Sequence, residues 1–348
     1  MPPPPPAPAA VNTPSEPSAR AAKVLVEAAG LRKSFDGQEV IRGIDLTITE
    51  GQIIGLIGPS GCGKTTTVKM LAGLLVPTEG TASVFGRRAD LLSSAQRQRI
   101  GYLPQTPALF PDLSLWENLS FHASMYGLRL RRKHRLRHVL DWVELVDDRK
   151  KKVREVSGGM QRRLALAAAF VHDPTLVFLD EPTAGIDPIL RSKFWDHFGE
   201  MSAEGRTLLV TTQYVGEAAY CDYVGLMSDG ELLMVDTPDN LRRAAFDGEV
   251  LDVGLASEPD DELLDHVAGI DGVIGRPETV DGRTLRVVVD NADEVTGRVD
   301  ARLRELGQQV TGIDEHFVDY DEAFVRVIQR HRRTDAEELV DVGQEGAG

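Results

Sequence analysis

The sequence has little cysteine and no long apolar run. Its two cysteines, Cys62 and Cys221, lie far apart in the chain, and such a pair indicates neither a disulfide framework nor a zinc site. No stretch comes near the roughly 18 consecutive apolar residues that a membrane-spanning helix needs. We therefore expect a chain that is soluble by itself and fits a cytoplasmic location.

The amino-terminal segment lacks the features of an export signal. Residues 1–22 are rich in proline and alanine and carry few charges. They have neither the basic start nor the apolar centre of a secretory signal. Because a segment of this composition cannot bury enough apolar surface to fold, we predict a disordered arm over residues 1–22.

Positive charge is in short supply, and the deficit lies in one part of the chain. The formal net charge is −15. Residues 1–247 contain 29 acidic and 29 basic side chains, whereas residues 248–348 contain 25 acidic and 10 basic ones. A net acidic chain argues against a nucleic-acid partner, because phosphate backbones attract basic surfaces. Basic stretches at 129–137 and 149–154 fit either solvated helix faces or a surface that meets anionic lipid or a membrane subunit.

One glycine-rich stretch matches G-x-x-x-x-G-K-[ST], the phosphate-binding P-loop. An apolar run at 52–57 predicts a buried strand before it, and 66–72 predicts a helix after it. Glycines let backbone N–H groups approach phosphates, and the helix N-terminus adds partial positive charge there. We expect Lys64 to reach the β- and γ-phosphates of a nucleoside triphosphate and the Thr65 hydroxyl to bind Mg²⁺. The motif and the residue after it are Gly58, Pro59, Ser60, Gly61, Cys62, Gly63, Lys64, Thr65 and Thr66.

A second apolar run ends in two carboxylates. Leu176–Leu179 is apolar at every position, which suits a strand buried on both faces of a parallel sheet. Such a sheet places its chemistry at the carboxyl ends of its strands, where Asp180 and Glu181 lie. Beside a P-loop, we expect Asp180 to hold Mg²⁺ through water and Glu181 to act as general base on the attacking water. An acidic pair that caps a strand end in solvent is the alternative.

With several shorter motifs, the region 24–247 resembles the ATP-binding subunit of an ABC transporter. Tyr102-Leu103-Pro104-Gln105 is similar to the family's Q-loop. Ser157-Gly158-Gly159-Met160-Gln161 matches its signature motif, and Gly185-Ile186-Asp187-Pro188 is similar to its D-loop. The resemblance implies an α/β fold, that of a P-loop NTPase (ABC ATPase). It also implies an antiparallel β subdomain and a helical subdomain at about 107–155.

The resemblance also implies ligands and roles for individual residues. ATP and Mg²⁺ would be bound, with Phe35 stacking on adenine and Gln105 touching Mg²⁺ or water. Ser157, Gly158 and Gly159 would meet the γ-phosphate held by a second subunit, and Asp187 would join the two sites across the dimer. A phenylalanine in the core and an ordinary loop amide are the alternatives for Phe35 and Gln105.

The loop after the strand 207–212 departs from the family pattern. Where the family usually carries a histidine, this chain has Gln213. An amide can donate a hydrogen bond to a γ-phosphate, but it cannot become cationic or shuttle a proton. We expect hydrolysis to persist, with Glu181 as the base and Gln213 and Lys64 as further catalytic residues.

The function that the resemblance implies is export. The Ser-Gly-Gly-Met motif, Gln213 and the carboxyl-terminal region resemble the daunorubicin-resistance-like drug exporters of ABC-2 type. Two copies would sandwich two MgATP and drive a separate integral membrane permease from the cytoplasmic face, exporting a drug or a lipid. A homodimer is expected, and a heterodimer with a different ATP-binding subunit is the alternative. A nutrient importer subunit, a soluble ABC ATPase without a transport role and a nucleotide-binding regulator without turnover are the alternatives.

The remaining sequence predicts an arrangement around this centre. Strands are expected at 23–27, 39–41 and 45–49, with Asp36-Gly37 as a turn. After residue 247, a strand at 285–289, a helix capped by Asn291 and a strand at 310–313 predict a small α+β domain over 248–330. It resembles the accessory domain of the drug exporters, with Asp321–Phe324 matching its closing helix, and suggests regulation or dimer contact. The acidic tail, 331–348, is predicted to be disordered.

Overall fold

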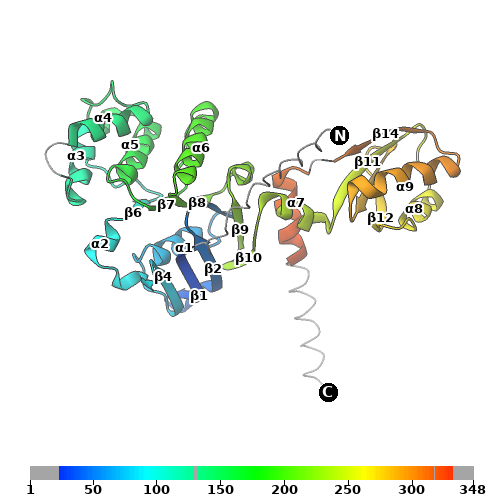
Figure 1. Cartoon of the computed structure of the whole chain (residues 1–348), viewed down its shortest axis with the longest axis horizontal. Coiled ribbons are helices and arrows are strands. Elements are labelled where there is room, and N and C mark those ends of the chain that lie inside the picture. The colour runs from blue at the N-terminus through cyan, green and yellow to red at the C-terminus, as the bar shows by residue number, and fades with distance from the viewer. Residues whose placement is uncertain (1–22, 129–131, 317, 332–348) are drawn as a thin grey trace, which may run out of the picture.

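The computed structural model describes residues 23–128, 132–316 and 318–331. The predicted arm at 1–22 and all of the predicted tail after residue 331 lie outside these ranges. Within them the chain forms three sheets with helices around them (Figure 1). None of the helices in these ranges combines the length and the apolarity needed to cross a membrane.

A six-stranded sheet forms the centre of the molecule, in the order β10-β9-β3-β8-β7-β6. Five strands are parallel, and β10 pairs with β9 in the antiparallel sense. β3, β7 and β8 are buried at every position, as expected for parallel strands covered on both faces. The strands are β3 (Ile53–Ile57), β6 (Ile100–Leu103), β7 (Leu176–Asp180), β8 (Thr207–Thr212), β9 (Tyr223–Ser228) and β10 (Glu231–Asp236).

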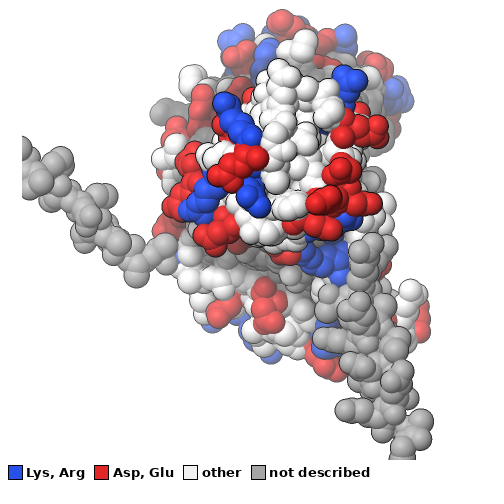
Figure 2. All heavy atoms as spheres, turned by 90° about the vertical axis from the view of Figure 1, so that its right-hand side faces the viewer, with Lys and Arg blue, Asp and Glu red and all other residues white. Residues whose placement is uncertain are grey.

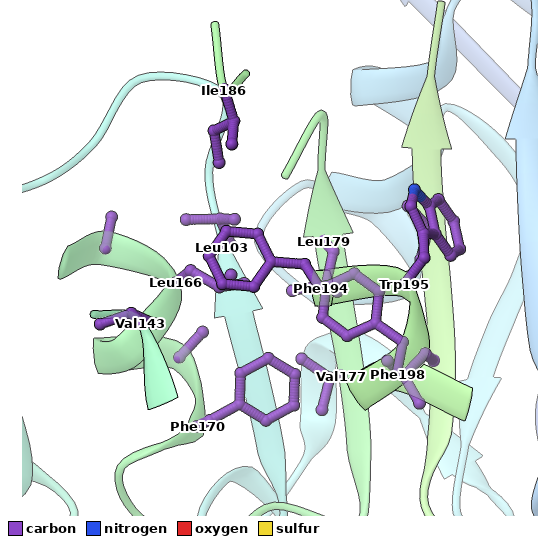
Figure 3. Close-up of a cluster of buried hydrophobic side chains, with 14 of the residues drawn as sticks. Leu103, Val143, Leu166, Phe170, Val177, Leu179, Ile186, Phe194, Trp195 and Phe198 are labelled. Carbon is purple, nitrogen blue, oxygen red and sulfur yellow. The ribbon is translucent and has the colours of Figure 1, made fainter. Parts of the chain in front are cut away.

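Apolar side chains cover both faces of this sheet. Because successive residues of a strand point to opposite faces, Val177 and Leu179 of β7 enter one core cluster, and Leu176 and Phe178 enter the other. Figure 3 shows the first cluster, where Phe170, Phe194 and Phe198 from two helices pack around the side chains of β7. The strand that carries the predicted carboxylates is therefore held rigidly from both sides.

The helices pack on both sides of the central sheet. Figure 1 places α3, α4 and α5 together on one side and α1 on the other. A capping box begins α3, where the side chains of Ser114 and Glu117 each accept a hydrogen bond from the backbone N–H of the other. The helices are α1 (Lys64–Leu71), α2 (Ser94–Arg97), α3 (Leu115–Met125), α4 (Lys133–Trp142), α5 (Gly158–Phe170), α6 (Pro188–Ala203), α7 (Pro238–Phe246), and the 3₁₀ helices η1 (Ala89–Leu91), η3 (Val153–Glu155) and η4 (Val215–Tyr220).

The amino-terminal strands are longer than the sequence predicts. The antiparallel pairing and the Asp36-Gly37 turn are confirmed, but the predicted bounds are wrong. Two 12-residue strands pair across the turn, and 39–41 and 45–49 belong to one of them. Their register shifts at several points, and such bulges let a ladder continue past residues that read as breaks. The four-stranded antiparallel sheet runs β2-β1-β4-β5, with β1 (Val24–Phe35), β2 (Gln38–Thr49), β4 (Glu79–Val84) and β5 (Arg87–Arg88).

A separate antiparallel sheet follows residue 248, in the order β12-β13-β11-β14. The structure contains the strand, the helix and the last strand expected from the sequence, and Asn291 caps the helix as predicted. Two strands and one helix of this unit were not predicted. Figure 2 faces the end of the molecule that this unit forms, where acidic and basic side chains surround an uncharged centre. Its elements are β11 (Glu249–Leu255), α8 (Asp261–Ala268), β12 (Val273–Thr279), β13 (Thr284–Val289), α9 (Ala292–Glu305) and β14 (Val310–Glu315).

The chain then returns toward the central unit. Residues 320–331 are helical, and Tyr320 and Ile328 are buried in the same core cluster as β7 and α5. Arg242 of α7 lies over the Tyr320 ring, 3.8 Å from its centroid. The last described segment thus packs on the central unit and connects it to the unit that follows residue 248.

Candidate nucleotide site

Four adjacent strands deliver the motifs to one edge of the central sheet. The P-loop follows β3, Gln213 follows β8, Glu181 follows β7, and Gln105 lies two residues after β6. The carboxyl ends of parallel strands share one edge, which is where open α/β sheets bind ligands. The topology therefore gathers segments that are far apart in the sequence.

The P-loop has the tight backbone that its glycines predict. Gly63 has φ 107°, a conformation that other residues rarely adopt, and a Cβ on Gly58 would lie 2.3 Å from the carbonyl oxygen of Met227. Gly63 begins α1 without any side-chain cap. The first-turn N–H groups of α1 are therefore available to an anion, with the helix dipole behind them.

Lys64 is folded into this loop. Its Nζ donates to the carbonyl oxygens of Gly58 at 2.6 Å and Pro59 at 2.9 Å, and the side chain is buried. The Cys62 thiol lies 3.9 Å from the same Nζ, and burial raises the pKa of that thiol. A phosphate entering the loop would compete with the two carbonyls for the lysine's protons.

Asp180 has the contacts expected of a metal-site carboxylate. Its Oδ1 accepts hydrogen bonds from the Thr65 hydroxyl at 3.0 Å and the Thr211 hydroxyl at 2.6 Å. Its Oδ2 is buried and has no hydrogen-bond partner among the described residues, although an unpaired buried oxygen is costly. Hard oxygen donors of this kind are the ligands that Mg²⁺ prefers, so the residues present fit that ion.

Glu181 adopts an uncommon backbone conformation at the end of β7. It has φ 52°, a region that non-glycine residues enter at a cost of about 1 kcal/mol or more. Its N–H donates to the carbonyl and the hydroxyl of Thr211, at 3.1 and 3.0 Å, and its Oε1 accepts from Gln213 Nε2 at 2.5 Å. Both side chains line a pocket of about 330 Å³ together with Tyr214. Glu181 therefore faces space that a water molecule can enter, and Gln213 contacts the carboxylate.

Phe35 and Gln105 lie outside this cluster. Phe35 ends β1 with 44% of its surface exposed, and Lys33 Nζ lies 5.1 Å from the ring centroid. The exposed Gln105 contributes its carbonyl oxygen, which accepts from Arg162 at 2.7 Å. The exposed ring contradicts the alternative that places Phe35 in the core, and its stacking on adenine stays a prediction.

The residues predicted to face a second copy bind their own helices in this structure. Ser157 caps α5, its Oγ accepting from a backbone N–H three residues on at 3.3 Å. Asp187 caps α6 in the same way at 3.0 Å. Gly158 and Gly159 form the first turn of α5. Among the described residues, no hydrogen bond joins any of these four to the P-loop.

Sequence reasoning missed two buried charged residues near the site. Arg162, on α5, donates to four carbonyl oxygens, and burial lowers the pKa of its guanidinium. Glu217, on η4, accepts from the Thr183 hydroxyl at 2.7 Å and lies 3.9 Å from Arg191. In the sequence Arg162 looks no different from its neighbour Arg163, so no local signal separates them. The fold and the site together define a P-loop ATPase of the ATP-binding cassette class.

Comparison with known proteins extends this class to a family. Residues 41–184 match the family model described as ABC transporter. The chain is 34% identical over 275 residues to the Nod factor export ATP-binding protein I of Burkholderia lata, covering 78% of this chain and 88% of that relative. It is 35% identical over 219 residues to the linearmycin resistance ATP-binding protein LnrL of Bacillus subtilis, covering 62% of this chain and 70% of LnrL. The chain belongs to the ABC transporter family.

Other relatives agree with this assignment. The chain is 38% identical over 228 residues to the probable multidrug ABC transporter ATP-binding protein YbhF of Escherichia coli, and the match covers 65% of this chain. It spans only 39% of the length of YbhF. A solved structure described as the ATP binding subunit of an ABC transporter superposes with a TM-score of 0.59 at 30% identity, covering 63% of this chain and 92% of that one.

Proposed function

We propose that this chain binds and hydrolyses MgATP as the ATP-binding subunit of an exporter. The observation that carries the proposal is the meeting of Thr65, Asp180 and Glu181 where β3 and β7 end. It joins an anion-binding loop, a metal-binding carboxylate and a candidate general base. Phosphoryl transfer needs mostly positioning and charge neutralisation, and these groups provide both.

Each residue then has a defined task. The N–H groups of the P-loop, from Gly58 to Thr66, hold the phosphates, and Lys64 neutralises their charge. The Thr65 hydroxyl and Asp180, through water, would hold Mg²⁺, with Gln105 beside it. The ion would supply charge neutralisation on the phosphate oxygens. Glu181 orients the attacking water and accepts its proton, and the Gln213 amide donates to the carboxylate or to the γ-phosphate.

A second copy of the chain completes the site. Ser157, Gly158 and Gly159 begin a helix whose N-terminus favours an anion, yet they make no hydrogen bond to the P-loop of their own subunit in the described chain. A head-to-tail homodimer would bring them to the partner's γ-phosphate, with Asp187 near the junction. Closure on ATP and release after hydrolysis would then drive a membrane partner.

The names of the relatives favour export over import. They are described as multidrug, linearmycin resistance and Nod factor export proteins. We infer that the partner is an integral membrane permease of ABC-2 type, that the chain works at the cytoplasmic face of the membrane, and that the cargo is a drug or a lipid.

Replacement of the general base tests this proposal. Glu181→Gln removes the proton acceptor but keeps the shape of the side chain, so ATP hydrolysis should fall by about 10²-fold or more. The same variant should accumulate an ATP-bound dimer, measured by size-exclusion chromatography with and without MgATP. Retained turnover would remove Glu181 from the base role. A variant that stays monomeric with ATP would contradict the shared site.

A further inference from the structure

Arg162 connects the signature helix to two strand ends of its own subunit. The side chain is 5% exposed and leaves α5 toward the central sheet. One guanidinium nitrogen donates to the carbonyl oxygens of Pro104 and Gln105, both at 2.7 Å. The other donates to the carbonyl oxygens of Asp180 and of Glu181, the latter at 2.6 Å.

This arrangement is unusual for a buried cation. Buried charges are normally paired with a carboxylate, whereas all four hydrogen bonds of Arg162 go to backbone carbonyl oxygens. A hydrogen bond to a charged group is stronger than one between neutral groups, so four of them hold the peptide groups firmly. The planar guanidinium fork also fixes their relative positions, which a lysine could not do.

The carbonyl groups that Arg162 holds belong to the proposed catalytic machinery. Two lie in the segment that carries Gln105, and two belong to the proposed metal-binding and general-base residues. Displacement of Arg162 would therefore move both segments together. A shift of about 1 Å in such groups can cost up to 10²-fold in rate.

The other end of the connection is the start of α5. Ser157 caps the helix, and Arg162 lies five residues further on. At about 1.5 Å of rise per residue, the two are separated by roughly 7–8 Å along one rigid helix. A displacement of the start of α5 would therefore move Arg162 by a similar amount.

We propose that Arg162 is a positioning residue that couples the two ATP sites of the dimer. The proposal rests on the function proposed above, in which Ser157 and Gly159 contact the nucleotide of the partner. Contact with that nucleotide fixes the position of α5. Arg162 then fixes the positions of Glu181 and Gln105 in its own subunit. Each site becomes fully competent only when the other holds ATP, so hydrolysis is cooperative.

The neighbouring arginine offers a matched control. Arg163 lies on the same helix and also donates to backbone carbonyl oxygens, those of Val143 at 2.9 Å and Glu144 at 3.3 Å. These two residues follow α4 and belong to none of the motifs that form the site. Arg162 and Arg163 therefore differ in the partners of the guanidinium and share their helix and type of contact.

The experiment compares Arg162→Gln with Arg163→Gln in the full chain. For Arg162→Gln we expect ATP affinity within about threefold of wild type, a fall in kcat of roughly tenfold or more, and a Hill coefficient for ATP that drops toward one. Arg163→Gln should keep kcat and the Hill coefficient. The split between affinity and kcat separates positioning from general loss of structure.

A second variant covers the case in which Arg162→Gln does not fold. Arg162→Lys keeps the charge but loses the fork, so it should fold and show partly restored kcat with cooperativity still reduced. Wild-type kcat and Hill coefficient in a folded Arg162 variant would overturn the inference. So would equal effects in the Arg162→Gln and Arg163→Gln variants. Absence of turnover in the wild type, or of an ATP-bound dimer in Glu181→Gln, would instead overturn the proposed function.

Discussion

The central unit, built around β3 and β7, and the unit formed by residues 249–315 both pack helices on a sheet, but they differ in what they bury. Among the described residues, all buried polar or charged side chains lie between Lys64 and Ser228. The buried side chains of 249–315 are apolar, with Leu285, Val287 and Leu303 at the centre. Buried polar groups are costly unless they are satisfied, so their concentration in one unit marks the place where the chain carries chemistry.

Net charge, unlike buried polar side chains, is concentrated in the second unit. The net charge of −15 lies in residues 248–348, yet the ion pairs of that region are mostly exposed, as between Arg276 and both Asp261 and Asp265. Exposed pairs contribute little to stability. Net charge is thus a poor guide to the site. A better guide in the described chain is a buried carboxylate oxygen without a hydrogen-bond partner, as in Asp180 and Glu217.

The strongest loss of activity should follow replacement of one carboxylate in the central unit, and replacement of a carboxylate in the second unit serves as its control. Asp180→Asn replaces the proposed metal-binding carboxylate, and we expect kcat to fall by about 10²–10³-fold. Asp252→Asn weakens hydrogen bonds to Arg286 at 2.9 and 3.0 Å and should lower the free energy of unfolding by roughly 1 kcal/mol. Its kcat should stay at the wild-type value. Steady-state ATPase assays over a Mg²⁺ series measure both variants.

Two outcomes would contradict this division of roles between the units. If Asp252→Asn lowered kcat as strongly as Asp180→Asn, the second unit would be part of the catalytic site. An Asp180→Asn variant with normal Mg²⁺ dependence would remove that residue from the metal site.

A large effect on stability alone is expected in the second unit. Leu303 of α9 is fully buried, and Leu303→Ala should lower the free energy of unfolding of this unit by about 2–5 kcal/mol through the cavity that it creates. Because the site lies in the other unit, kcat at 25 °C should not change. Denaturant unfolding and ATPase assays on one preparation measure the two quantities. If kcat fell together with the stability, the second unit would support the site.

A smaller effect depends on pH and should arise in the central unit. Burial lowers the pKa of His172 to about 4, below the value of about 6.5 in an unfolded chain. The unfolded state then binds more protons between pH 6.5 and 4, so stability is lost as the pH falls through this window. We expect a contribution on the order of 1–2 kcal/mol after allowance for solvent screening.

His172→Gln isolates this contribution. The amide can still donate to the Ile100 carbonyl, which lies 3.0 Å from His172 Nε2, but it does not titrate. Denaturant unfolding at pH 7 and pH 4.5 should show a smaller drop in stability for this variant than for wild type. The exposed His134 serves as control, and an unchanged drop in His172→Gln would contradict the prediction.

The smallest effect is expected at Gln213, in the loop that follows β8. Gln213→Ala removes the 2.5 Å hydrogen bond to Glu181, and we expect kcat to fall by roughly threefold to tenfold with the affinity for ATP retained. The kcat of Gln213→His should lie well above that of Gln213→Ala, because the imidazole ring can also donate to a phosphate. Equal kcat in wild type and Gln213→Ala would leave the residue without a role in phosphate sensing or in orienting Glu181.

The sequence predicts the features that depend on short-range patterns. The P-loop class, the buried strand β7 and the helix cap Asn291 are all confirmed. Each depends on residues within a few positions of one another, and local physics determines such structures. The roles of individual site residues stay predictions.

Features that depend on tertiary packing were not predictable. The sequence pattern does not predict β11, α8 and β12. Acidic residues interrupt the apolar positions of β11 and α8, and β12 contains Gly275 and Pro277, which argue against a strand. The bond from Gln213 to Glu181 joins residues 32 positions apart. Arg162 and Arg163 read alike along the sequence, and only the assembled sheet shows that one of them enters the site.

The backbone conformation of Glu181 has a consequence for how this chain would respond to selection. A glycine there would relax the left-handed turn and stabilise the fold by up to about 1 kcal/mol, while deleting the carboxylate. A screen that rewards heat resistance alone would therefore enrich inactive proteins at this position. Laboratory evolution of a hardier version must score turnover and thermal survival together.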